Sequence, residues 1–396
     1  MNRPLAGLGL LAALGAASGA AAQAAGPAAR FDVVGRGPVT NTRTTDLAVF
    51  RAPNGRDYAY TGTFGDCQRC SGNRMFVFDV TDPAHPVRTD SVVVDAKIVN
   101  DVAVNREGTL AVLTREGATS RRNGLVILDL ADPAHPRQTA EFWETITGGA
   151  HNVFLDGKLA YVVDAGTWDL VVVDLSDLRD PVQVGRWSLE TSTMRLLQDV
   201  YVKDGLAYLS AWDDGLVILD VGQGIKKGTP QHPQMVSQFR YRTRWHGEQY
   251  GHTHFAYPYT NAAGHAYVFV GDVIIPRGVD LNKRFDSGGS IHVLDVSRLT
   301  APLEVASYAV EGAGVDHFWI ENDVLYTAAL TAGVHAADVS GDLRGTLRGR
   351  EIASFSTADP HGFVPNLAMA WAVRPHNGLL FATDFNSGLW IARLTR

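Results

Sequence analysis

The sequence has few cysteines, few charged residues and no excess of positive charge. Only 2 of its 396 residues are cysteine, which excludes a fold held together by several disulfides. Charged residues make up 19%, and 35 Lys and Arg stand against 42 Asp and Glu, for a formal net charge of −7. This balance argues against a nucleic-acid-binding protein, because such proteins carry a basic footprint for the phosphates. The hydrophobic content of 45% is typical of a folded globular protein.

Known catalytic signatures are also absent from the sequence. It contains no nucleophile elbow, no Walker motif and no glycine-rich phosphate loop. The glycines occur mainly where a hairpin turn explains them. Motifs of contiguous residues therefore assign no reaction to this chain, and any site has to be assembled from distant residues.

The first residues have the pattern of a secretory signal peptide. Arg3 is followed by the apolar run 5–14, by small residues and by Ala22-Gln23-Ala24, a typical cleavage pattern. The run is too short and too rich in Gly and Ala for a membrane anchor, and no later stretch approaches the length of a membrane span. We therefore expect residues 1–25 to be removed and the mature protein to be periplasmic or extracellular.

The two cysteines stand close together, as Cys67-Gln68-Arg69-Cys70. In an oxidising compartment the expected outcome is a local disulfide between Cys67 and Cys70. A redox-active pair would need a helix N-terminus after the first cysteine, but the flanking Gly, Ser and Asn residues indicate a loop. A zinc site would need further ligands from elsewhere in the chain.

An apolar run that ends in Asp recurs along the chain. The recurring Asp residues are Asp79, Asp129, Asp174, Asp220, Asp295 and Asp338, and the run 389–392 is a seventh copy without the Asp. Their spacings are 50, 45, 46, 75 and 43 residues. Periods of this length with several strand-like pieces in each copy are typical of a β-propeller. The spacing of 75 predicts an insertion in the fifth copy, over residues 272–289.

Each copy divides into four strand-like pieces separated by turns. The last copy ends before its fourth piece, and residues 31–36 near the N-terminus resemble the fourth piece of the third copy, residues 182–186. We predict an all-β fold: a seven-bladed β-propeller closed by an N-terminal strand that completes the last blade. Residues 26–396 then form one domain.

The run Leu-Val-Ile/Val-Leu/Val-Asp, as in 125–129, 170–174 and 216–220, resembles the LVIVD-repeat family of exported bacterial and archaeal propellers. The resemblance extends over roughly residues 31–396. It implies the propeller fold and export, and it implies no particular activity. We interpret the repeated Asp as structural, since its carboxylate can accept backbone N–H groups of the following turn.

The first strand of each copy should line the central channel, so the residues at its start should form a ring at the channel mouth. The polar members of this ring are Asp46, Asp101, Asn152, Asp199, His254 and His317. We expect Asp46, Asp101 and Asp199 to contact a ligand at the top of the channel.

Four histidines are candidate metal ligands: His151, His252, His254 and His317. His252 and His254 are two residues apart, so both side chains of an extended strand would point to one side. Neutral imidazoles suit zinc, copper or iron, and carboxylates can complete the shell. The alternative is that these polar groups merely line a wet channel and bond to the backbone.

Loops on the same face carry further candidate ligand-binding residues. Arg244 lies in an arginine-rich loop before the histidine pair and can hold a carboxylate or phosphate. Trp168 and Trp212 occupy corresponding loops and can stack on a sugar or aromatic ring, although packing between blades explains them equally well.

Two functions fit these observations. The first is a binding or scaffold protein of the cell envelope, with a small molecule, a glycan or an envelope protein as its partner. The second is a metal-dependent enzyme, a hydrolase, lyase or oxidase, that uses the His and Asp cluster. The fold hosts both classes. We expect a monomer that binds no nucleic acid and has no membrane span, and we favour binding because no base or nucleophile is singled out.

Overall fold

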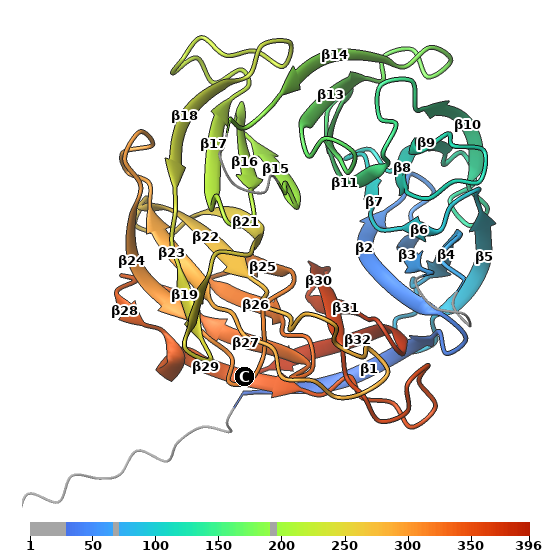
Figure 1. Ribbon diagram of the computed structural model, residues 1–396. Coiled ribbons are helices and arrows are strands. Elements are labelled where there is room, and N and C mark those ends of the chain that lie inside the picture. The colour runs from blue at the N-terminus through green and yellow to red at the C-terminus, as the bar shows by residue number, and fades with distance from the viewer. Residues whose placement is uncertain (1–28, 66–70, 191–195) are drawn as a thin grey trace, which may run out of the picture.

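The computed structural model describes residues 29–65, 71–190 and 196–396, which form seven radial sheets around a central axis (Figure 1). The described residues contain strands and one 3-10 turn, Arg348–Arg350, but no α-helix. The predicted all-β, seven-bladed propeller is confirmed. None of the described segments forms a helix long and apolar enough to cross a membrane.

The strands of blades 1 to 4 run outward from the axis in chain order. Blade 1 contains β2 (Arg43–Arg51), β3 (Asp57–Phe64), β4 (Arg74–Asp79) and β5 (Val87–Val93), with β6 (Ile98–Val99) beside β3. Blade 2 contains β7 (Val102–Val104), β8 (Leu110–Arg115), β9 (Gly124–Asp129) and β10 (Arg137–Phe142). Blade 3 contains β11 (Ala150–Asp156), β12 (Leu159–Asp164), β13 (Leu170–Asp174) and β14 (Val182–Trp187). Blade 4 contains β15 (Asp199–Lys203), β16 (Leu206–Ser210), β17 (Leu216–Asp220) and β18 (Gln234–Phe239).

The remaining blades carry the additions to the pattern. Blade 5 contains β21 (Thr253–Thr260), β22 (Ala266–Asp272), β23 (Ile291–Asp295) and β24 (Leu303–Tyr308), extended by β28 (Gly345–Thr346). The hairpin β19 (Thr243–Trp245) and β20 (Glu248–Tyr250) precedes it. Blade 6 contains β25 (Phe318–Glu321), β26 (Val324–Ala328), β27 (Val334–Asp338) and β29 (Glu351–Phe355). Blade 7 contains β30 (Ala370–His376), β31 (Leu379–Asp384) and β32 (Gly388–Thr395), with β1 (Arg30–Pro38) outermost.

The N-terminal strand closes the ring as predicted. β1 pairs antiparallel with β32, from Arg30 opposite Thr395 to Pro38 opposite Gly388. The start and the end of the chain therefore share one sheet, and the seventh blade has its fourth strand.

The repeated Asp has the structural role predicted for it. Asp79, Asp129 and Asp174 each accept a hydrogen bond from the backbone N–H two residues later. Asp295 and Asp338 do the same, and Asp220 accepts four such bonds from the loop 222–228. The apolar residues before each Asp are buried, because each blade is packed between two neighbours. The motif therefore fixes the third strand and the turn that follows it.

The predicted insertion forms a strap across several blades. Ile275, Leu281 and Phe285 pack on a buried cluster formed by Val273 of the strap with residues of blades 6 and 7, Leu330, Met369 and Phe385. The Asn282 Oδ1 atom accepts a hydrogen bond from Arg43 of blade 1 at 3.2 Å. The strap of blade 5 thus reaches blade 1, on the side of the ring where the first strands begin.

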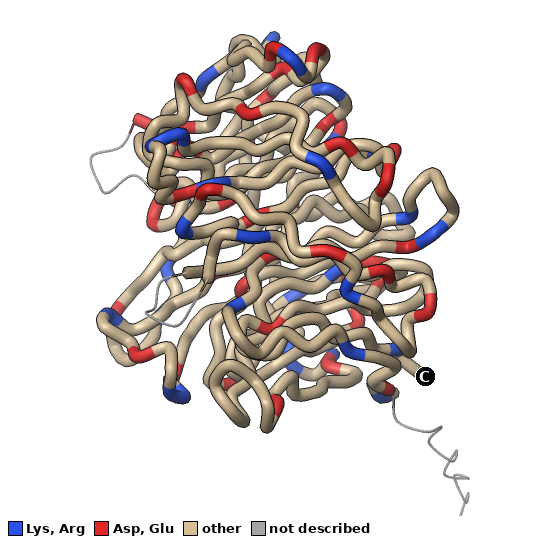
Figure 2. The backbone as a smooth tube through the Cα atoms, turned by 90° about the vertical axis from the view of Figure 1, so that its right-hand side faces the viewer, with Lys and Arg blue, Asp and Glu red and all other residues tan. Residues whose placement is uncertain are grey.

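Acidic and basic residues are interspersed along the backbone over the side of the molecule in Figure 2. The predicted signal peptide, residues 1–25, lies outside the described residues. The predicted disulfide between Cys67 and Cys70 lies outside them as well.

Candidate functional site

A cavity of about 490 Å³ occupies the central channel. It is lined by the first strands of the seven blades, from Asp46, Asp101 and Asp199 at one end to Phe50 and Pro375 toward the other. Asp101 and Asp199 stand where β7 and β15 begin, and Asp46 lies in the first half of β2, so the three carboxylates form one end of the cavity. The predicted ligand-binding aspartates are therefore brought together, although they belong to blades 1, 2 and 4.

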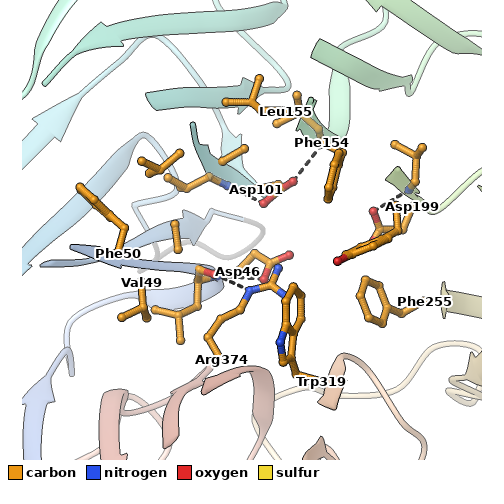
Figure 3. Close-up of a pocket in the computed structure, with 18 of the residues that line it drawn as sticks. Asp46, Val49, Phe50, Asp101, Phe154, Leu155, Asp199, Phe255, Trp319 and Arg374 are labelled. Atoms are coloured by element: carbon orange, nitrogen blue, oxygen red, sulfur yellow. Dashed lines mark hydrogen bonds between the residues drawn. The ribbon is translucent and has the colours of Figure 1, made fainter. Parts of the chain in front are cut away.

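The same hydrogen bond, from the backbone N–H of the following residue, orients each of these carboxylates. The Oδ1 atom of Asp46 accepts a hydrogen bond from the N–H of the next residue at 2.8 Å, and those of Asp101 and Asp199 do so at 2.6 Å. The Oδ2 atom of Asp101 also accepts the N–H of Val153 at 2.9 Å, which ties blade 2 to blade 3. Figure 3 shows the three carboxylates directed into the cavity.

His317 lies between two of the carboxylates. Its Nε2 atom is 3.4 Å from Oδ2 of Asp46 and 3.3 Å from Oδ2 of Asp199, and its Nδ1 atom is 2.7 Å from Oδ1 of Asp316. Burial alone would lower the pKa of His317, but the surrounding carboxylates of Asp46, Asp199 and Asp316 outweigh burial and raise it well above its usual range. His317 therefore carries positive charge at neutral pH.

Asp101, unlike Asp46 and Asp199, forms no ion pair with His317. Its burial, together with the negative charges of Asp46 and Asp199, raises the pKa of Asp101 to about 8. One imidazolium is opposed by three carboxyl groups, and the excess negative charge is relieved by a proton on Asp101. This end of the cavity is therefore suited to a positively charged or proton-donating group.

His254 lies beside His317 but has different surroundings. The two rings have their centroids 5.3 Å apart, and Nδ1 of His254 is 3.2 Å from the backbone oxygen of Asp316. Burial lowers the pKa of His254 and keeps its ring neutral. One donor atom each from His254, Asp316 and His317 lie within 4.8 Å of one another, so this group can hold a metal ion.

The other two predicted metal ligands lie outside this group. His151 has its ring nitrogens 2.9 Å from Glu116 and 3.0 Å from Gln198. His252 stacks on Trp212 with ring centroids 4.2 Å apart. Its φ of 51° interrupts the extended backbone just before β21, so the expectation that His252 and His254 point to one side is not met.

Aromatic side chains form the wall of the cavity next to the carboxylates. Phe154 and Tyr201 have ring centroids 4.8 Å apart, and Tyr201 lies 5.9 Å from Trp319. The guanidinium of Arg374 lies 4.1 Å from the ring centroid of Trp319, and its Nε donates to the Leu47 backbone oxygen. Figure 3 shows Phe154, Phe255 and Trp319 around the cavity.

The sequence reasoning missed these wall residues, although a signal for three of them was present. Phe154, Tyr201 and Trp319 each stand two residues after a predicted ring position: Asn152, Asp199 and His317. Residues i and i+2 of a strand share a face, so the residues two positions after the ring positions also face the channel. Arg374 follows a bulge between Ala370 and Ala372 that shifts the register of β30, so the period of two does not predict its place in the wall.

The predicted loop residues do not line the cavity within the described part of the chain. Trp168 packs its ring edge-on against His151 with centroids 5.9 Å apart, and Trp212 stacks on His252. Arg244 is exposed on the hairpin β19–β20, outside the channel. Both tryptophans are half-buried against a histidine, and Trp168 also lines a separate, smaller pocket.

The comparisons with known proteins support the repeat and the fold. The LVIVD repeat matches residues 120–141, 147–188 and 195–240, and the last two stretches contain the whole of blades 3 and 4. No curated protein matches the chain.

Solved structures similar to this chain have distant sequences, and one of them is a β-propeller domain by description. The Cps50 (Swd1) β-propeller domain from Myceliophteria thermophila is 11% identical with a TM-score of 0.58, over 91% of this chain and 99% of that chain. A chain of the COPII outer coat vertex on membranes is 11% identical with a TM-score of 0.60, over 89% and 84%. The computationally designed Ika8 protein is 10% identical with a TM-score of 0.52, over 91% and 98%. These likenesses show the fold alone.

Proposed function

We propose that this chain, a seven-bladed β-propeller that carries LVIVD repeats, is an exported binding protein of the cell envelope whose central channel holds a small organic cation. The observation that carries the proposal is the convergence of Asp46, Asp101 and Asp199 on one end of a cavity with aromatic walls. The volume of about 490 Å³ is within the range of small-molecule sites.

The charge at the aspartate end of the cavity favours an ammonium group in the ligand, although Arg106 and Arg374 also line the cavity. His317 is the imidazolium that faces Asp46 and Asp199, and Asp101 retains a proton because its negative charge would otherwise add to theirs. A bound ammonium ion would provide the same neutralisation as that proton, with charge-assisted hydrogen bonds to the carboxylates.

The walls of the cavity favour an apolar body beside the cationic group. Phe154, Phe255 and Trp319 present ring surface next to the carboxylates. Aromatic faces attract cations that lie within about 6 Å of the ring centroid, and they bury apolar surface at the same time. An arylalkyl or alkyl amine satisfies both parts of the cavity.

Binding is favoured over covalent catalysis by the residue types in the cavity. The lining formed by the described residues contains carboxyl groups, a phenol and arginines, but no serine, cysteine or lysine. The nucleophiles of most covalent mechanisms are therefore missing from the cavity wall.

The test is titration calorimetry of the mature protein with tyramine, benzylamine and benzyltrimethylammonium, and with benzyl alcohol as the neutral counterpart of benzylamine. We expect the amines to bind and the alcohol not to bind. Asp199→Asn and Trp319→Leu should each weaken amine binding by roughly tenfold or more, which corresponds to at least 1.4 kcal/mol. Trp168→Leu, a tryptophan outside the cavity, is the control and should bind as the wild type does.

Calorimetry in buffers of different ionisation enthalpy adds a second readout. If an ammonium ion replaces the proton on Asp101, binding at pH 7 releases a proton to the buffer. Equal affinity for benzyl alcohol and benzylamine, or no effect of Asp199→Asn, would overturn the proposal.

A further inference from the structure

We infer that His254, Asp316 and His317 form a binding site for a transition-metal cation such as Zn²⁺, beside the channel cavity and linked to its carboxylates through His317. The three residues come from neighbouring blades: His254 from β21 of blade 5, and Asp316 and His317 from the segment just before β25 of blade 6. All three side chains are largely buried, with 13%, 2% and 4% of their surface exposed. A metal there would join the two blades close to the axis.

The Asp316 carboxylate is spaced from both histidine nitrogens as metal ligands require. Two ligands that each lie about 2.1 Å from one ion are at most about 4.2 Å apart. Oδ1 of Asp316 is 2.7 Å from Nδ1 of His317 and 3.8 Å from Nδ1 of His254, so both separations fall within that limit. A metal ion would displace the hydrogen atom that Nδ1 of His317 shares with Asp316 and the one that Nδ1 of His254 directs at the Asp316 backbone oxygen.

The chemistry of the donor set matches zinc and its neighbours in the first transition row. Two imidazoles and one carboxylate are the protein ligands of many zinc sites that keep a further coordination position for water or substrate. The hydrogen bond from Nδ1 of His254 to the backbone oxygen of Asp316 shows that the imidazole is already directed at this segment.

His317 has the outer support that metal-bound histidines usually have. Its second ring nitrogen, Nε2, faces the carboxylates of Asp199 and Asp46 at 3.3 and 3.4 Å. Carboxylates in this position fix the orientation of a ligand histidine and leave the other nitrogen for the metal. The three-residue group is therefore a supported site and not an isolated histidine pair.

The test uses Co²⁺ as a spectroscopic probe of the mature protein, expressed without a polyhistidine tag and treated with a chelator. We expect one equivalent of Co²⁺ to give visible d–d absorption bands, and one equivalent of Zn²⁺ to remove them. His254→Gln and Asp316→Asn should each weaken Co²⁺ binding by roughly tenfold to a hundredfold, as loss of a ligand or its support does at other sites.

Matched controls are available among the neighbouring histidines. His252→Gln and His151→Gln change imidazoles that lie near the group but outside it, so both should bind Co²⁺ as the wild type does. Circular dichroism confirms that each variant is folded, and the melting temperature of the wild type should rise with added Zn²⁺. Absence of d–d bands in the wild type, or bands that persist in His254→Gln and Asp316→Asn, would refute the site.

Discussion

The Nε2 atom of His317 lies 3.3 Å from the Oδ2 atom of Asp199, although 118 residues separate them in the chain. The two residues belong to blades 6 and 4, which are not neighbours in the ring. Asp46 of blade 1 contacts the same nitrogen at 3.4 Å. One buried imidazolium therefore links three blades, and it offsets part of the negative charge at the end of the channel.

Replacing His317 tests this link. In His317→Gln, Asp46 and Asp199 stay buried without their cation, so we expect a loss of about 3–5 kcal/mol in the free energy of unfolding. The double variant His317→Gln/Asp199→Asn should recover part of the loss, because it removes one of the two unpaired charges. Urea unfolding at pH 7 measures both, with His135→Gln in an exposed turn as the control. A double variant no more stable than the single one would contradict the link.

The proton on Asp101 leads to a second prediction, on how the stability of the protein depends on pH. The pKa of Asp101 is raised to about 8 in the folded state, against about 3.9 in the unfolded chain. The native state therefore holds more protons than the unfolded state between these values, and the contribution of Asp101 to stability falls as the pH rises from about 4 to about 8. Asp101→Asn should gain stability relative to the wild type as the pH rises through this window.

Thermal unfolding at several pH values checks the prediction for Asp101. The difference in melting temperature between Asp101→Asn and the wild type should shift toward the variant from pH 5 to pH 8. Asp342→Asn removes an exposed carboxylate and serves as the control. If the difference in melting temperature between Asp101→Asn and the wild type did not change with pH, the raised pKa of Asp101 would be contradicted.

A second effect of pH on stability is expected from His292 in blade 5, whose protonated form is stabilised by carboxylates. Burial would lower the pKa of His292, but the carboxylates of Asp272, 3.9 Å from Nε2, and of Glu304, hydrogen-bonded to Nδ1, raise it to about 9. A group with a raised folded pKa contributes stability below its unfolded value of about 6.5, and this contribution is lost as the pH rises through about 9.

The expected size of the His292 effect is on the order of 2–3 kcal/mol between pH 6.5 and 9. Chemical unfolding over that range measures it. His292→Gln should flatten this part of the pH profile, and Glu304→Gln should reduce its slope, since Glu304 lies 2.7 Å from Nδ1 of His292. A profile unchanged in both variants would refute the assignment.

The parts of the fold that the sequence predicts are those determined by local pattern. The apolar run before each repeated Asp fixes a buried third strand, and the turn after it follows from the carboxylate, so the number of blades could be counted. The ring of Asp46, Asp101, Asp199 and His317 could be found because equivalent positions of a repeat occupy equivalent places around the axis.

The parts that could not be predicted depend on tertiary contacts. The position of His252 depends on a single left-handed backbone conformation and on stacking against Trp212, which no periodicity reveals. The strap at residues 272–289 follows no repeat, and its path is set by contacts such as Asn282 with Arg43 of another blade. The position of Arg374 depends on a bulge that shifts the register of β30, so alternation along the strand does not predict it.

Closure of the ring brings β1 into close contact with the turn of blade 1 at Pro83. A Cβ atom on Gly35 would lie 2.0 Å from the backbone oxygen of Pro83 and 3.0 Å from its carbonyl carbon. Gly185 in blade 3 has the same relationship to blade 4, with the backbone oxygen of Pro230 at 2.1 Å. The two glycines occupy the matching fourth-strand segments of the predicted repeat, and both allow the turn of the next blade to approach closely.

Gly35→Ala should therefore weaken the closure of the propeller. Because the clashing atoms are backbone, the turn or β1 has to move, and we expect a loss of about 2–4 kcal/mol in the free energy of unfolding. Gly349→Ala, where a Cβ meets nothing within 4 Å, should be nearly neutral. Hydrogen exchange locates the effect: Gly35→Ala should accelerate exchange in β1 and β32, whereas Gly185→Ala should act on blades 3 and 4 and leave β1 protected. If Gly35→Ala matched Gly349→Ala in stability and exchange, the contact between β1 and the turn at Pro83 would not be what holds the ring closed.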